Sequence, residues 1–170
     1  MDKNEKNLEG SLENWRKGVA SIEDVRSLAQ DLGAYLYMPG VPALLELLDH
    51  KDDMVRHNAA ASLAMNFHYT PATGKLLVML ASDPDEDCRS MAASCLASLC
   101  HDTKDHAVLA ALAKASLEDP DEYVRNSAYQ ALLFVNGLPK EQRQSVFQDP
   151  PHVDPDRVRS ILGDISERLL

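Results

Sequence analysis

Apolar residues recur along this chain at the spacing of an α-helix rather than that of a strand. Three stretches carry the same stripe, in which an apolar residue is followed by Ala and Leu four and eight positions later. The stripes are Val55, Ala59 and Leu63; Cys88, Ala92 and Leu96; and Val124, Ala128 and Leu132. Positions i, i+4 and i+8 share one helix face. The pattern predicts buried helices within residues 50–67, 83–100 and 119–136.

The doublet of an apolar residue and arginine indicates that these helices belong to a repeat. It occurs at Arg26, Arg56, Arg89, Arg125 and Arg159, so the arginines lie 30, 33, 36 and 34 positions apart. A period of this size is typical of stacked helical units that share one elongated core. The sequence therefore predicts an all-α repeat protein.

Each predicted unit also has a shorter first helix and an acidic turn. The first helices are expected at residues 41–48, 74–81 and 107–117, upstream of turns rich in aspartate. In two turns an Asp precedes a Pro and further acids, which predicts Asp83 and Asp119 as N-caps with Pro at the first helical position. We expect one continuous domain, with an N-terminal helical cap at 1–40, three repeats at 41–139 and capping helices at 140–170.

Composition and charge narrow the range of partners and compartments that we expect for the protein. The chain is 45% hydrophobic but only 5% aromatic, and 17 basic against 27 acidic side chains give a formal charge of −10. Such a surface disfavours nucleic acid and anionic membranes as partners and favours basic proteins. Three cysteines, an odd number, fit a reducing compartment, and no signal-like apolar stretch opens the sequence. We expect a cytoplasmic protein of undetermined oligomeric state.

Residues 41–139 resemble HEAT repeats, particularly the short HEAT-like class. The resemblance rests on paired helices of 30 to 36 residues, an Asp-Pro-acid turn between them, and Val-Arg at the start of the second helix. It implies an armadillo-like right-handed α-α superhelix, a solenoid of about four to five hairpins. It further implies a ladder of turn aspartates and arginines along the stack. On this sequence the ladder comprises Asp53, Asp87, Asp119 and Asp121 with Arg56, Arg89 and Arg125.

No motif in the sequence indicates catalysis or a bound metal. Cys88 and Cys95 are seven residues apart, unlike the close pairs of structural zinc sites, so we interpret the cysteines as small buried hydrophobic residues. The six histidines lack partners at catalytic spacing, and neither a phosphate-binding loop nor a dinucleotide-binding turn occurs. The sequence therefore predicts a protein that is not an enzyme and needs no cofactor or metal.

The outward face of the second helices is poor in charge. A face that is merely solvated would carry more Lys and Glu, whereas small polar residues mixed with Met and Phe suit a contact surface. The alternative is that part of this face packs on neighbouring helices. The residues of this second-helix surface are His57, Asn58, Ala61 and Met65; Ser90, Met91, Ser94 and Ser98; and Asn126, Ser127, Gln130 and Phe134.

The successive turns form a second candidate surface, an acidic rim. Its carboxylates either attract a basic partner or serve only to cap helices and bind the arginines. The rim comprises Asp49, Asp52 and Asp53; Asp83, Asp85, Glu86 and Asp87; Glu118, Asp119, Asp121 and Glu122; and Asp154 and Asp156.

These surfaces predict a non-enzymatic protein-interaction module, a scaffold that binds a protein through a concave, charge-poor groove with an acidic rim. One alternative is an immunity or inhibitor protein that neutralises a basic toxin. A further alternative is a HEAT-like lyase or DNA-repair relative. The last class is disfavoured because Trp15 is the single tryptophan and the net charge is opposite to that of a DNA-binding groove.

Overall fold

A computed structural model describes residues 3–148 and 152–168, and within these ranges every regular element is helical. The all-α prediction is therefore confirmed. The chain forms two compact units, Met1–Ala72 and Thr73–Leu170, and the boundary falls inside the predicted segment 41–139. The proposed division into a cap, three repeats and closing helices stays a prediction.

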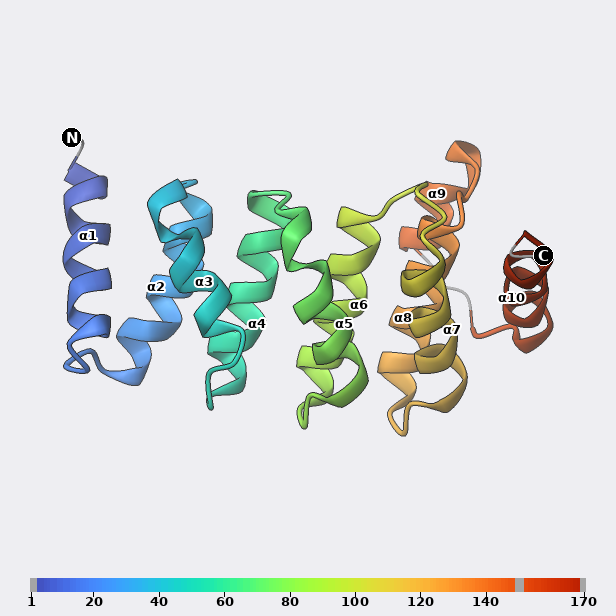
Figure 1. Ribbon diagram of the computed structural model, residues 1–170, viewed down its shortest axis with the longest axis horizontal. Coiled ribbons are helices and arrows are strands. Elements are labelled where there is room, and N and C mark those ends of the chain that lie inside the picture. Colours follow the sequence, from blue (N-terminus) through green and yellow to red (C-terminus); the bar gives the residue numbers. More distant parts are fainter. Residues whose placement is uncertain (1–2, 149–151, 169–170) are drawn as a thin grey trace. The chain divides into compact units, whose positions relative to one another are not determined.

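The described part of the first unit, residues 3–72, contains four α-helices and three short helical segments. Helix α2 packs against α1, α3 and α4, and α4 runs directly into η2, a π-helical segment (Figure 1). The elements are α1 (Lys3–Arg16), α2 (Ile22–Ala34), η1 (Met38–Gly40), α3 (Val41–Leu47), α4 (Asp53–Ala61), η2 (Ser62–Asn66) and η3 (Thr70–Ala72).

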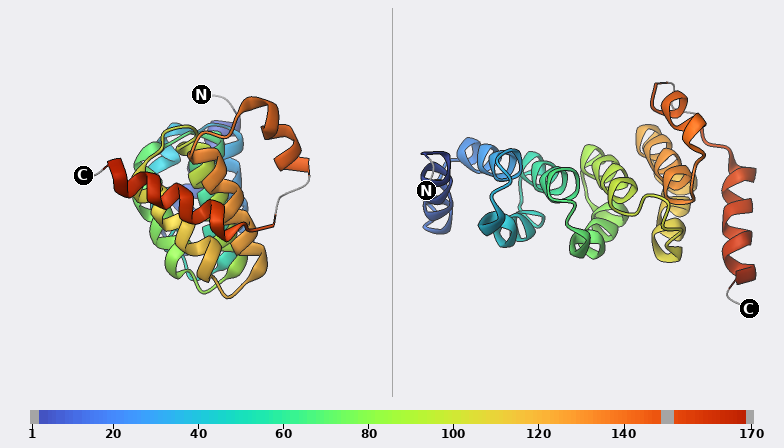
Figure 2. Two further views of the ribbon diagram at one scale, coloured as in Figure 1. Left: turned by 90° about the vertical axis from the view of Figure 1, so that its right-hand side faces the viewer. Right: turned by 90° about the horizontal axis from the view of Figure 1, so that it is seen from above.

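The second unit is built from helical hairpins. Helices α5 and α6 pack as one pair and α7 and α8 as the next, while α6 and α8 lie side by side. Seen from above, α6 and α8 occupy one layer and α5 and α7 the other (Figure 2). The elements are α5 (Thr73–Ser82), α6 (Glu86–Leu99), α7 (His106–Glu118), α8 (Glu122–Val135), α9 (Lys140–Gln148) and α10 (Pro155–Arg168).

The stripes read from the sequence form the centre of each unit. All nine residues of the three stripes are fully buried, as predicted. Leu28, Leu32 and Leu44 in the first unit and Leu76 and Leu112 in the second are also buried. Complete burial of a leucine-sized side chain contributes about 1.5–3 kcal/mol, so aliphatic packing supplies the main stabilisation of the hairpins.

The helix starts differ from the prediction by two residues. Asp85 and Asp121, not Asp83 and Asp119, are the N-caps of α6 and α8, and their carboxylates accept the amides of Cys88 and Val124 at 2.9 and 3.0 Å. The earlier aspartates instead close the turn, because each accepts the N–H of the residue two positions on. The proline therefore lies in the turn and not at the first helical position.

A glycine and a serine set the approach of α2 to η2. Ser62 is buried, and its hydroxyl donates a hydrogen bond to the carbonyl of Ala29 at 2.7 Å. A Cβ on Gly33 would lie 2.6 Å from the Cβ of Ser62, closer than side chains pack. Only a residue without a side chain fits at position 33.

None of the helices in the described part of the chain combines the length and the apolar character that a membrane-spanning segment needs.

Candidate interaction surface

Three arginines bind the turn that precedes their own helix. In each case Nη1 donates to the carbonyls six and five residues earlier. The distances to these two carbonyls are 2.9 and 3.2 Å for Arg56, 2.9 and 3.4 Å for Arg89, and 2.8 and 3.1 Å for Arg125. The repeated arginine thus satisfies carbonyl groups of an irregular turn and fixes that turn on its helix.

Two arginines, Arg89 and the earlier repeat member Arg26, connect one hairpin to the next. Arg26 donates to both carboxylate oxygens of Asp52, at 2.9 and 2.7 Å, and Arg89 does the same to Asp119, at 2.9 and 3.1 Å. These bonds lower the pKa of the Asp52 carboxyl and raise the pKa of both guanidinium groups. Paired hydrogen bonds between charged groups are among the strongest in proteins.

The observed pairs match the predicted ladder only in part. Asp119 pairs with Arg89, and Asp121 caps α8. Asp52, which the prediction placed in the rim but not in the ladder, is the partner of Arg26. Asp53 lies in the first turn of α4, and Asp87 is exposed in the first turn of α6.

In the first unit the second-helix surface is partly used for packing. The Asn58 amide donates to the Arg26 carbonyl at 3.2 Å and so ties α4 to α2. His57 and Ala61 are half-buried, and His57 Nδ1 is a buried atom that has no hydrogen-bond partner among the described residues. Met65 is 44% exposed. Of the four residues, Met65 offers the largest accessible apolar side chain.

In the second unit, two predicted surface residues prove to be buried. Ser90 is 5% exposed, and its hydroxyl lies 2.9 Å from that of Ser127 between α6 and α8. Phe134 is also 5% exposed and packs against the ring of His101. The loop after α6 covers Phe134, because the amide of Asp102 donates to the Phe134 carbonyl. The prediction that these two side chains face outward is therefore wrong.

The other residues of this surface in the second unit remain partly accessible. Gln130 donates to the Val146 carbonyl at 3.0 Å and connects α8 to α9. Ser94 donates to the Ser90 carbonyl within α6. Met91, Ser98 and Asn126 are half-buried.

Much of the acidic rim maintains the turns. Asp52, Asp85 and Asp121 cap helices, Asp83 and Asp119 close turns, and Asp154 and Asp156 bind backbone or arginine at the start of α10. In the second unit, four other rim carboxylates are exposed on the surface of the turns. They are Glu86, Asp87, Glu118 and Glu122.

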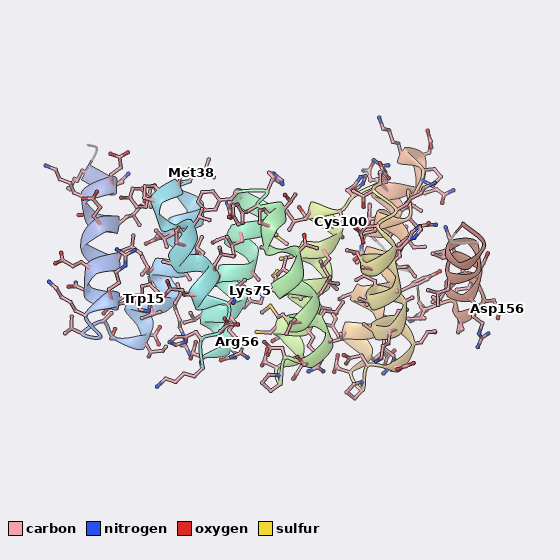
Figure 3. The ribbon with its side chains drawn as sticks, viewed as in Figure 1. Trp15, Met38, Arg56, Lys75, Cys100 and Asp156 are labelled. Atoms are coloured by element: carbon pink, nitrogen blue, oxygen red, sulfur yellow. The ribbon has the colours of Figure 1, made fainter. Side chains whose placement is uncertain are left out.

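The three cysteines lie in the core of the second unit. Cys88, Cys95 and Cys100 are buried, which confirms their interpretation as small core residues. Burial raises the pKa of the Cys95 thiol to about 12. It also raises the pKa of Cys100, which lies at the C-terminal end of α6 (Figure 3). Among the described residues, no three potential metal ligands gather within reach of one ion.

Sequence reasoning missed an exposed apolar loop in the first unit. Tyr35, Leu36 and Met38, between α2 and α3, are 55%, 57% and 61% exposed. The sequence feature that could have predicted this loop is a run of large apolar residues that belongs to no helical stripe and precedes Pro39 and Gly40.

Comparison with known proteins agrees with the repeat architecture. The family model for HEAT repeats matches residues 21–97 and, in a second register, residues 41–133. No curated protein matches the chain. The matched segments together cover more than half of the sequence and include every arginine of the three central turns. The chain therefore belongs to the HEAT-repeat family, whose helical repeats act as scaffolds for protein interaction.

Proposed function

We propose that this protein is a non-enzymatic adaptor that binds a protein partner through the accessible residues of the second-helix surface in one of its two units or in each of them. The observation that carries the proposal is the exposure of Met65 and the partial exposure of Met91 on a surface whose twelve residues include no Lys, Arg, Asp or Glu. Methionine is enriched at protein interfaces and charged residues are depleted at their centres. Because Ser90 and Phe134 are buried, the proposed contact residues are the remaining members of the surface.

The four exposed rim carboxylates of the second unit favour a basic partner. Glu86, Asp87, Glu118 and Glu122 are exposed, and the whole chain carries a formal charge of −10. Exposed charges of one sign steer an oppositely charged partner and raise its association rate, an effect that weakens with salt. An inhibitor of a basic toxin is one specific form of this proposal.

The experiment is affinity capture from extracts of the cells that make the protein, with two charge-insertion variants and matched controls. Met65→Glu and Met91→Glu place a carboxylate on the proposed surface. Met54→Glu is a fitting control, because Met54 is likewise 44% exposed but lies in the first turn of α4. Val78→Glu on α5, where Val78 is 64% exposed, is the control for the other helical layer.

We expect Met65→Glu, Met91→Glu or both to lose a partner that the wild type and both controls retain. Circular dichroism and melting curves establish that all four variants are folded. A retained partner in both Met65→Glu and Met91→Glu would overturn the assignment of this surface. Binding that is independent of salt between low and physiological ionic strength would overturn the role of the exposed carboxylates.

A further inference from the structure

Arg89 and Arg125 bind their own turns in the same way but differ at the other edge of the guanidinium group. Nη1 of each donates to the carbonyls six and five residues earlier. Nε and Nη2 of Arg89 also donate to the two carboxylate oxygens of Asp119 in the next turn, at 2.9 and 3.1 Å. Within residues 3–148 and 152–168, no group accepts a hydrogen bond from Nε or Nη2 of Arg125. Arg125 therefore presents a donor edge that Arg89 uses to hold a carboxylate.

The sequence of the last turn explains why the series of arginine pairs stops at Arg125. The Asp-Pro-Asp turn recurs at residues 154–156, but the arginine that follows it, Arg159, lies five positions after the first aspartate. Arg89 and Arg125 lie six positions after theirs. One residue fewer rotates a side chain by about 100° around a helix axis. Arg159 instead pairs with Asp156 on α10, and both side chains are exposed (Figure 3).

The aspartate that corresponds to Asp119 in this last turn is directed to its own helix. Oδ1 of Asp154 accepts the amides of Asp156 and Arg157, at 3.0 and 3.1 Å, and the residue is exposed. In the described part of the chain, the last turn thus does not supply to Arg125 the carboxylate that the preceding turn supplies to Arg89.

The unused edge of Arg125 is held in place and open to solvent. Arg125 is half-buried, and Nη1 is fixed by the carbonyls of Asp119 and Pro120, at 2.8 and 3.1 Å. Among the described residues, His57 Nδ1 is the buried side-chain nitrogen or oxygen atom that lacks a partner, so solvent reaches Nε and Nη2 of Arg125. A ligand that binds a side chain already held in place loses little conformational entropy.

We propose that the Nε–Nη2 edge of Arg125, here named the open arginine edge, binds the carboxylate of an aspartate or glutamate side chain on a partner protein. The ligand chemistry follows from the filled sites, because Arg26 and Arg89 each bind both oxygens of one aspartate through Nε and Nη2. The planar guanidinium group matches the two oxygens of a carboxylate with two parallel hydrogen bonds.

The surroundings favour a ligand with a single negative charge. Glu122 is exposed and lies three residues before Arg125 on the same helix, so a second negative charge on the ligand would be repelled. This argument favours a carboxylate over phosphate. The inference rests on the proposed function in one respect, namely that the ligand belongs to a protein partner.

The test is a titration of the full, nitrogen-labelled chain, followed by nuclear magnetic resonance of the Nε–H group of Arg125. The probe is acetyl-Ala-Asp-Pro-Gly amide, which carries the Asp-Pro pair of the turns and one negative charge, and the matched peptide carries Asn in place of Asp. We expect a saturable shift at millimolar concentration, with the Asn peptide about two- to fivefold weaker, as for partly exposed ion pairs. Equal responses to the two peptides, or no saturable shift, would overturn the proposal. Tighter binding of inorganic phosphate would overturn the assignment to a carboxylate.

Two variants locate the binding group. Arg125→Lys keeps the positive charge but removes the second donor edge, so we expect it to lose the preference for the Asp peptide, observed at the amides of residues 125–127. Because this variant also loses turn contacts, Glu122→Gln provides a second measurement that leaves Arg125 intact. It removes the neighbouring negative charge and should tighten the Asp peptide but not the Asn peptide.

Glu141→Gln is the matched control, because Glu141 is likewise exposed in the first turn of a helix, α9. If Glu122→Gln bound the Asp peptide no more tightly than Glu141→Gln, binding at the open arginine edge would be excluded. The peptide titration reports on Arg125, whereas affinity capture with Met65→Glu and Met91→Glu reports on the second-helix surface. Each proposal can therefore fail while the other holds.

Discussion

Arg89 and Asp119 form two parallel hydrogen bonds between successive hairpins, with side chains that are only 12% and 7% exposed. The same aspartate serves its own turn, because Oδ1 also accepts the amide of Asp121 at 2.9 Å. Its backbone carbonyl accepts Nη1 of Arg125 at 2.8 Å. One residue therefore joins α6, the turn between α7 and α8, and the start of α8.

We expect Arg89→Ala to destabilise the second unit by about 2–4 kcal/mol. The substitution leaves a largely buried carboxylate without its cation and two turn carbonyls without their donor. Urea denaturation followed by circular dichroism measures the change. The Asp119→Ala variant and the double variant complete a cycle, in which we expect the two effects to be strongly non-additive.

Arg159→Ala is the control for this experiment. Arg159 also pairs with an aspartate, Asp156, but the two side chains are 69% and 93% exposed. Exposed pairs contribute about 0–1 kcal/mol. If Arg89→Ala were no more harmful than Arg159→Ala, the inter-hairpin pair would not stabilise the fold.

The helices and the core could be predicted because both follow from local periodicity. Val55, Cys88 and Val124 repeat in one stripe, and a stripe of that spacing has one face to bury. The arginine pairs were harder to predict, because several acids stand in each turn and their roles differ by position. His50 occupies the place of Asp83 and Asp119, and its Nδ1 accepts the amide of Asp52. The carboxylate available to Arg26 is consequently that of Asp52, two residues later.

The limits of the surface prediction have a similar physical origin. Helical spacing identifies which face of α6 and α8 is opposite the stripe, but not how closely the two helices approach. Ser90 and Ser127 are small enough to meet at 2.9 Å, and the loop that carries Asp102 crosses the end of α8. Long-range contacts of this kind leave no periodic signal in the sequence.

Stability of the first unit should fall in acid through Asp52. Arg26 holds the pKa of the Asp52 carboxyl below its ordinary value, so the folded state binds a proton less readily than the unfolded chain. This stabilisation is complete above the unfolded pKa, about 3.9, and is lost as the pH falls through the lower folded value. Urea midpoints measured between pH 7 and pH 2 are expected to show that loss.

The variant Asp52→Asn isolates the contribution of the Asp52 charge to the stability of the first unit. Asparagine retains the ability to cap α4, as Asp52 does through the amide of Val55 at 3.2 Å, but it carries no charge. We expect the variant to be less stable than the wild type at pH 7 and the difference to shrink towards pH 2. A difference that stays constant over this range would assign the effect to packing and not to charge.

Gly33→Ala should destabilise the first unit by about 1–3 kcal/mol, because the added methyl group would overlap Ser62 and force α2 away from η2. Thermal melting measures the loss.

Gly10→Ala is the control. Gly10 lies inside α1, and a Cβ added there would meet nothing within 4 Å, so alanine should stabilise the unit by about 0.5–1 kcal/mol. The Gly33→Ala effect should diminish when Ser62→Gly is added. Equal melting temperatures for the two single variants would show that α2 and η2 do not pack as closely as described.

The cysteines should react with thiol reagents only when their unit opens. Cys88 and Cys95 are fully buried, so a reagent has little access to either thiol. Burial also raises the pKa of Cys95 to about 12, so its reactive thiolate is scarce at pH 8. With an aromatic disulfide reagent, followed by absorbance, we expect Cys95 to react at least about a hundredfold more slowly than in guanidinium chloride. Cys100, which is 8% exposed at the end of α6, should react first. Single-cysteine variants separate the three rates. If Cys95 reacted as fast in the native chain as in denaturant, the packing of α6 against α5 and α8 could not be as close as the buried Ala92 and Leu96 require.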